Sequence, residues 1–117
     1  MSGELNIMIM SGVDDGSVMR CSAVNGDGMK EGNTWVLAVG RHDNNDICLN
    51  NDTFVSRYHA RIHVKGDDCW LEDQESTNGS YIEISDGDDE QVLTRIQLSP
   101  GQLFRVGRTW LRIESYE

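Results

Sequence analysis

The 117-residue sequence is poor in positive charge, with 10 lysines and arginines against 20 aspartates and glutamates, for a formal net charge of −10. A surface of this sign repels nucleic acid and anionic lipid, so neither a nucleic acid nor a membrane is expected as a partner. The surplus of carboxylates is more typical of solubility than of an acidic recognition surface. A local cluster of arginines in such a chain is informative, because the overall field does not create it.

Long apolar runs and paired cysteines are also lacking. The longest apolar run, Trp35–Val39, is far too short to cross a bilayer, and the first four residues have neither the basic start nor the apolar stretch of a signal peptide. The three cysteines are odd in number, and no spacing among them indicates a metal site. Reduced thiols in a cytoplasmic, monomeric protein are the simplest interpretation, and we expect neither a metal nor another cofactor.

No window of a dozen residues has a convincing helical period. Instead, turn signals recur at short intervals between runs of β-branched, aromatic and alternating apolar residues. These signals are Asp14–Gly16, Asn25–Gly28, Lys65–Asp68, Ser85–Asp88, Ser99–Gly101 and Gly107–Arg108. For a chain of this length, the pattern predicts one all-β domain, a sandwich or a barrel, with a core of its own.

Two hairpins can be placed in register from the sequence. A turn at Gly66-Asp67 gives an apolar inner face and an outer face with an opposite-charge pair. The expected pairs are Val64 with Cys69 and Ile62 with Leu71 inside, and Arg61 with Glu72 and His63 with Trp70 outside. A turn at Gly107-Arg108 is of the Gly-X kind that hairpins favour. It pairs Phe104 with Leu111 inside and Arg105 with Trp110 outside.

Three short stretches carry most of the functional information: Gly40-Arg41, Ser56–His59 and Ser76–Gly79. Continuing the first hairpin past its strand ends brings Ser56 roughly opposite Thr77, so the second and third stretches are expected to be neighbours. Together the three stretches supply two guanidinium groups, hydroxyls and an amide. This set suits a fixed anion with three acceptor oxygens, such as a phosphate on a partner protein.

In this order, the three stretches resemble the forkhead-associated (FHA) domain, and the resemblance extends over roughly residues 35–113. It implies an all-β, FHA/SMAD-like sandwich of about eleven mostly antiparallel strands, two of them before this range. It also implies one FHA domain over residues 1–117, with a core at about 5–114. Such a module is not an enzyme: it binds phosphothreonine in partner proteins during signalling, through loops at one end of the sandwich.

The resemblance gives five residues a role in binding a phosphopeptide. Arg41 would contact the phosphate, Ser56 would donate its hydroxyl to a phosphate oxygen, and Arg57 would add a second basic contact. Thr77 would contact the ligand near the phosphothreonine, and Asn78 would hydrogen-bond the peptide backbone around it.

Three further residues, Gly40, His59 and Gly79, would hold these loops in shape. Arg108 lies in a similar Val-Gly-Arg stretch but is expected to be a turn residue.

The segment Glu83–Arg95 is longer and more acidic than its counterpart in the family. We expect it to be a solvated hairpin or loop that could alter the preference for residues after the phosphothreonine.

Three alternatives remain open. Ser56 and His59 could be a nucleophile and a base, although residues three apart on an extended segment point to opposite faces. The acidic runs Asp43–Asp46 and Asp86–Glu90 could bind calcium, but the EF-hand spacing fails, because position twelve from the first aspartate is Phe54. The third alternative is an FHA-like module that binds its partners without phosphate.

Overall fold

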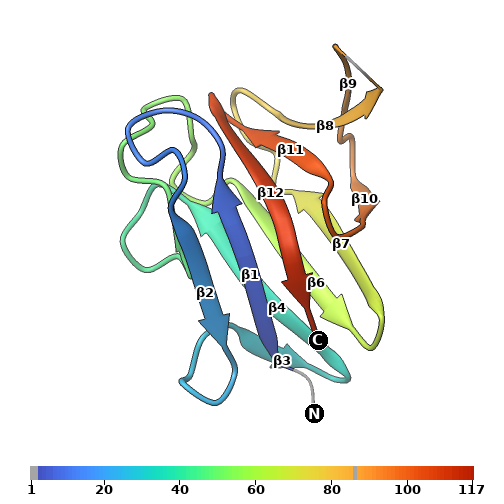
Figure 1. Ribbon diagram of the computed structural model, residues 1–117. Coiled ribbons are helices and arrows are strands. Elements are labelled where there is room, and N and C mark those ends of the chain that lie inside the picture. The colour runs from blue at the N-terminus through green and yellow to red at the C-terminus, as the bar shows by residue number, and fades with distance from the viewer. Residues whose placement is uncertain (1–2, 86) are drawn as a thin grey trace.

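The computed structural model describes residues 3–85 and 87–117 (Figure 1). Met1, Ser2 and Asp86 lie outside the described residues. Asp86 belongs to the expected turn Ser85–Asp88 and to the acidic run Asp86–Glu90 that was considered for calcium. No helix within the described ranges is long and apolar enough to cross a membrane. Twelve strands are present in these ranges. They are β1 (Glu4–Ile9), β2 (Val18–Ser22), β3 (Met29–Glu31), β4 (Thr34–Gly40), β5 (Ile47–Cys48), β6 (Ala60–Lys65), β7 (Asp68–Asp73), β8 (Ser80–Ser85), β9 (Asp88–Gln91), β10 (Arg95–Leu98), β11 (Leu103–Val106) and β12 (Thr109–Tyr116).

The strands form two six-stranded sheets that pack face to face. One sheet has the order β2-β1-β12-β11-β8-β9, and the other has the order β10-β7-β6-β4-β3, with β5 added beside β4. Apart from the short parallel pair β4–β5, the described pairings are antiparallel. The predicted sandwich is therefore confirmed. Three strands rather than two precede β4, because the short strand Met29–Glu31 was not anticipated.

Both predicted hairpins have the expected register. All the pairs proposed for β6–β7 and for β11–β12 face each other across their strands. Arg61 and Glu72 are opposite one another as expected, and the Glu72 carboxylate lies 3.0 Å from Nε2 of His63 on the same strand as Arg61. The alternation of apolar and polar residues was sufficient to fix this register, because a slip of one position would expose Ile62 and Leu71.

The core lies between the inner faces of the two sheets. Alternate residues of β1 are buried, and the same alternation recurs on β11 and along much of β12. The largest fully buried side chains include Leu5, Leu37, Ile62, Phe104 and Leu111. Each such side chain contributes roughly 1.5–3 kcal/mol relative to remaining exposed. This rigid interior leaves the loops at the sandwich ends to carry specific contacts.

The acidic segment Glu83–Arg95 forms a hairpin, as predicted. Strand β9 pairs with β8, and its four residues are all exposed. One residue of the segment, Val92, turns inward and is buried in the core. The hairpin is therefore solvated along most of its length but fixed at its base.

The loops that follow β4, β5 and β7 gather at one end of the sandwich, at the top of Figure 1, and both chain termini lie at the other end. The β6–β7 turn also lies at the end with the termini. This arrangement brings the three sequence stretches to one rim. We call the loops of residues 41–46, 49–59 and 74–79 the rim loops.

Candidate functional site

The two arginine-bearing stretches run side by side. The amide of Arg41 donates to the carbonyl of Ser56 at 3.0 Å, and the amide of His42 donates to the carbonyl of Arg57 at 3.3 Å. This close approach requires glycine at the end of β4, because a Cβ atom on Gly40 would collide with the carbonyl oxygen of Arg57. The glycine therefore permits the backbone pairing that puts both arginines on one rim.

Asn45 fixes the first loop to the second. Its buried side chain donates from Nδ2 to the carbonyl oxygens of His42 and Arg57, both at 2.8 Å. Among the described residues, its Oδ1 atom is buried without a hydrogen-bond partner. Asp46, which follows it, accepts hydrogen bonds from the amides of Gly28 and Ala38, both at 2.8 Å. These residues of a run considered for calcium therefore bind the protein's own backbone.

Arg41 is exposed, and its side chain is anchored at one point only. Nε donates to the carbonyl of Val55 at 2.9 Å. Neither Nη atom has a protein partner among the described residues. The anchored Nε fixes the guanidinium plane, and the two Nη groups remain available to an external acceptor. Arg57 is also exposed on the rim.

Ser56 lies where the second and third stretches meet. Its Oγ accepts a hydrogen bond from the amide of Thr77 at 3.2 Å. This contact confirms the neighbourhood predicted by continuing the β6–β7 hairpin. Because the hydroxyl acts here as an acceptor, its own hydrogen remains available to donate to a ligand.

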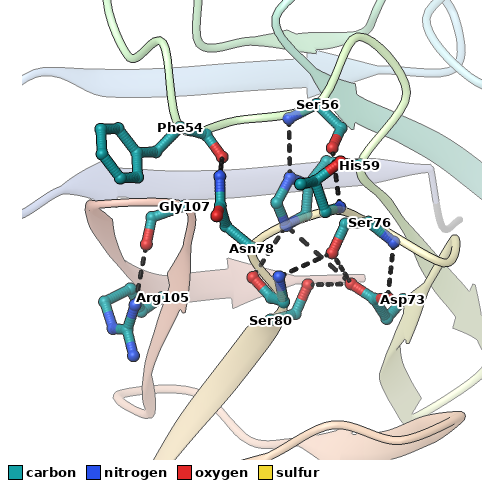
Figure 2. Close-up of polar contacts among 11 residues, drawn as sticks. Phe54, Ser56, His59, Asp73, Ser76, Asn78, Ser80, Arg105 and Gly107 are labelled. Carbon is teal, nitrogen blue, oxygen red and sulfur yellow. Dashed lines mark hydrogen bonds and ion pairs between the residues drawn. The ribbon is translucent and has the colours of Figure 1, made fainter.

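His59 is fully buried below these loops, and both of its ring nitrogens are engaged (Figure 2). Nδ1 accepts from the amide of Ser56 at 2.9 Å, and Nε2 donates to the carbonyl of Gly79 at 2.9 Å, which assigns the proton to Nε2. Burial lowers the pKa of His59, and the hydrogen bond to Gly79 and the charge of Asp73 oppose this effect. The neutral ring therefore ties the second stretch to the third.

The extended geometry expected for Ser56–His59 is wrong. Residues 57 and 58 form a turn, which lets the His59 ring reach back to the backbone of Ser56. The Ser56 hydroxyl contacts Thr77 rather than the imidazole. With one ring nitrogen on each of two backbone groups, His59 is not placed to act as a general base toward that hydroxyl.

A carboxylate shapes the third stretch, and sequence reasoning missed it. Asp73, at the end of β7, accepts from the amide and hydroxyl of Ser76 and from the hydroxyl of Ser80, at 2.6–3.0 Å (Figure 2). The hydroxyl of Ser76 in turn accepts from the amide of Gly79 at 3.0 Å. Aspartate is a turn-forming residue because its side chain hydrogen-bonds nearby backbone groups, so its place at the end of an apolar strand could have indicated this role.

Asn78 projects from this loop toward the second one (Figure 2). Its Nδ2 donates to the carbonyl of Phe54 at 2.9 Å. Asn78 is exposed and retains one amide hydrogen and an acceptor oxygen for other contacts. Thr77, next to it, is likewise exposed on the rim. Gly79 has a left-handed φ of 83°, which favours glycine where the loop turns into β8.

The β11–β12 turn supports the second loop from the side. Asp52 accepts from the amide of Arg108 at 2.8 Å and from the hydroxyl of Thr109 at 2.6 Å. Arg108 lies in the turn, as predicted, and its guanidinium carbon is 3.7 Å from the centroid of the exposed Phe54 ring. A Cβ atom on Gly107 would approach Val55 to 2.8 Å, so the turn also packs tightly against this loop.

The rim therefore has the exposed Arg41, Arg57, Thr77 and Asn78 and the half-buried Ser56 close together, above a buried histidine. A family model described as "FHA domain" matches residues 37–107. The chain belongs to the FHA domain family. The resemblance seen in the sequence is thus confirmed, and so is the prediction that the chain is not an enzyme.

Curated relatives match part of this FHA domain. FhaB of Mycobacterium tuberculosis, an FHA domain-containing protein, is 32% identical over 77 residues, or 66% of this chain and 46% of its own length. Its counterpart in Mycolicibacterium smegmatis is 34% identical over 82 residues, or 70% of this chain and 48% of its own length. The chain spans about half the length of these relatives.

Solved structures share the fold over almost the whole chain. One comes from a study of phosphothreonine-dependent FHA domain interactions, with a TM-score of 0.69, 23% identity and coverage of 97% of this chain and 98% of that one. Another is the FHA domain of the CT664 protein of Chlamydia trachomatis, with a TM-score of 0.72, 22% identity and coverage of 97% and 99%. The FHA-type sandwich therefore includes strands outside the range of the family match.

Proposed function

We propose that this FHA domain binds phosphothreonine-containing segments of partner proteins at the rim loops, in signalling. The observation that carries the proposal is the convergence of donors there. The Nη groups of Arg41 and the exposed guanidinium of Arg57 form no ion pair with a carboxylate of the protein, and the hydroxyl hydrogen of Ser56 has no protein acceptor. This statement applies to the part of the chain that the structure describes.

The chemistry of the ligand matches these donors. A phosphothreonine carries nearly two negative charges and three acceptor oxygens at neutral pH. A guanidinium meets two of these oxygens with a planar fork, which a lysine cannot reproduce. Each charge-assisted hydrogen bond contributes about 1.5–3 kcal/mol. Removal of the Arg41 guanidinium is therefore expected to weaken binding roughly tenfold or more.

Thr77 and Asn78 are proposed to hold the peptide rather than its phosphate. Asn78 has an amide hydrogen and an acceptor oxygen left after its bond to Phe54, enough for a reciprocal pair with a peptide backbone. Gly40, His59 and Gly79 are proposed to keep the loops in this arrangement, through the close approach and the hydrogen bonds described above.

Preference for phosphothreonine over phosphoserine depends on one methyl group. Burial of a methyl group alone contributes about 0.8 kcal/mol, or roughly fourfold in affinity. A larger preference requires a close fit of the methyl group against the rim. Relatives solved with a phosphopeptide, such as Mycobacterium tuberculosis EmbR, make this class of ligand the first to test.

The partner class and cellular setting are part of the same proposal. We propose a monomeric, cytoplasmic module with no nucleic-acid or membrane partner, and one independent domain over residues 1–117. Support comes from the net charge of −10, from three cysteines that form no disulfide, and from a single core cluster that runs from Leu5 to Ile113.

An oriented phosphothreonine peptide library identifies the preferred sequence, and matched peptides then test the proposal. Calorimetry with phosphothreonine, phosphoserine and unphosphorylated copies of the best peptide is expected to give binding in that order of strength. The Arg41→Ala variant is expected to lose at least about tenfold in affinity. Equal binding of all three peptides would instead favour the phosphate-independent interaction module.

A further inference from the structure

Two exposed aromatic side chains flank Ser56 along the chain. Phe54 is 38% exposed and Tyr58 is 53% exposed. Each is stacked on a residue of another segment: Arg108 lies over Phe54, and the ring of His42 is 5.6 Å from that of Tyr58, with the two planes 23° apart. The second rim loop therefore carries one exposed aromatic side chain before Ser56 in the sequence and one after it.

The His42–Tyr58 pair is built on the same backbone frame as the arginines. His42 follows Arg41 directly, and Tyr58 follows Arg57 directly. The hydrogen bonds that hold the two arginine-bearing stretches together therefore also hold the two rings in place. Nδ1 of His42 lies 2.7 Å from Oδ1 of Asn44 and 3.2 Å from its amide nitrogen, and these contacts further fix the imidazole.

An exposed, rigidly held aromatic pair in a polar rim is typical of a contact surface. Tyrosine contributes a large area and loses little conformational entropy on binding, and it is enriched among the residues that dominate interface energies. As a structural tie alone, the pair would add little, because Asn45 and two backbone hydrogen bonds already join these loops.

Resting on the proposed function, we propose that the His42–Tyr58 pair is a specificity determinant that stacks against an aromatic side chain of the phosphorylated partner. This side chain would flank the phosphothreonine in the partner's sequence. An aromatic side chain fits this surface, because the exposed ring of Tyr58 offers a stacking face. The adjoining Arg41 and Arg57 repel a basic side chain.

Two contributions to binding then become separable. Arg41 and Ser56 discriminate phosphorylated from unphosphorylated threonine, whereas Tyr58 discriminates among phosphopeptides that differ at one flanking position. Stacked aromatic pairs favour an aromatic residue over alanine at that position by about three- to tenfold in affinity.

The test compares two phosphothreonine peptides that differ only at the flanking position where the library shows its strongest aromatic preference, one with phenylalanine and one with alanine. The wild-type domain is expected to bind the phenylalanine peptide about three- to tenfold more tightly. Tyr58→Ala is expected to bring this ratio close to one while the alanine peptide still binds as to the wild type. Tyr58→Phe keeps the ring and is expected to retain the ratio.

Val24→Ala is the matched control, because Val24 is 92% exposed and lies outside the rim loops. An unchanged ratio in Tyr58→Ala, or a library without aromatic preference at any flanking position, would overturn the proposal while leaving phosphothreonine binding intact. Failure of the wild-type domain to distinguish any phosphorylated peptide from its unphosphorylated copy would instead defeat the proposed function, and this inference with it.

Discussion

At the scale of single residues, the geometry of the rim depends more on how closely the loops contact one another than on the number of charged side chains. Gly40 has an ordinary negative φ, so its identity is set by the Arg57 carbonyl that faces its Cα. His59 carries no charge in the folded state, yet it connects two of the three stretches. Both residues act on the ligand only through the positions of their neighbours.

Gly40→Ala is expected to lower the free energy of unfolding by about 1–3 kcal/mol, because the added Cβ atom forces the Arg57 segment away. Phosphopeptide affinity should fall as well, since the backbone pairing of the two arginine-bearing stretches is lost. Gly66→Ala is the control: its φ of 59° also penalises alanine, but it has open space around it and lies at the far end of the sandwich. Calorimetry measures both affinities. A Gly40→Ala protein that binds the phosphopeptide as tightly as the Gly66→Ala protein does would contradict this account.

The buried His59 gives the domain a specific dependence on pH. Burial lowers its pKa in the folded state below the ordinary histidine value of 6.5, so the unfolded chain binds more protons below that pH. The free energy of unfolding is therefore expected to fall as the pH drops through about 6.5, and to level off below the folded-state pKa. The pKa of Asp52 is also lowered, so Asp52 affects the free energy of unfolding in a separate pH range, below its ordinary pKa of 3.8.

Chemical denaturation between about pH 5 and 8 measures this effect, and His59→Asn is expected to flatten the curve. The ring resonances of wild-type His59, followed by NMR, offer a second measurement that does not require the variant to fold. They should report a neutral ring at pH values where an exposed histidine is protonated. A ring that titrates at 6.5 or above would be inconsistent with the burial described here.

At the scale of elements, the rim is held by hydrogen bonds that join loops and turns distant from one another in the sequence. Asp52 joins the second rim loop to the β11–β12 turn through Arg108 and Thr109, more than 50 residues away. It also accepts from the amide of Phe54 at 2.9 Å. Burial disfavours the charged carboxylate, but these hydrogen bonds and the charge of Arg108 favour it and lower the pKa of Asp52.

Asp52→Ala is expected to destabilise the domain by about 1–3 kcal/mol, since three donors lose one acceptor group. Asp52→Asn should recover part of this loss, because one of its amide atoms still accepts. Asp67→Ala, a change of the same kind in the exposed β6–β7 turn, serves as the control. Urea denaturation measures all three variants, and equal stabilities for the Asp52→Ala and Asp67→Ala proteins would show that the joint is unimportant.

The sequence was sufficient to predict those elements whose information is local. The β6–β7 and β11–β12 hairpins follow from alternation and turn residues, and the approach of Ser56 to Thr77 follows from the first hairpin. The roles of Asp52 and Asn45 could not be predicted, because their partners depend on tertiary packing rather than on spacing. The turn at residues 57–58 was missed because the tie between His59 and the Ser56 amide overrides the extended pattern.

At the scale of the whole molecule, a rim with two exposed arginines belongs to a protein with a net charge of −10.

The core of the same sandwich buries two of the three cysteine thiols. Burial raises the pKa of Cys21 and of Cys69 to about 12, with Asp27 and Asp46 adding to the effect on Cys21. Cys48 is only half-buried and follows the first rim loop.

A thiol reagent at neutral pH is therefore expected to label the folded protein once, at Cys48, because thiolates are the reactive species and the other two thiols are buried and protonated. Unfolding in denaturant should expose all three thiols. Intact-mass analysis counts the labels, and Cys48→Ser should remove labelling of the folded state. Rapid native labelling of Cys69 would mean that the sandwich opens more readily than its packing implies.

The central claim is that one rim of the sandwich recognises phosphothreonine, and an NMR titration of the backbone amides tests it most directly. A phosphothreonine peptide is predicted to shift the resonances of Arg41, Ser56, Arg57, Thr77 and Asn78, whereas its unphosphorylated copy leaves them in place. Shifts that cluster at the end with the termini, or identical shifts with both peptides, would contradict the account.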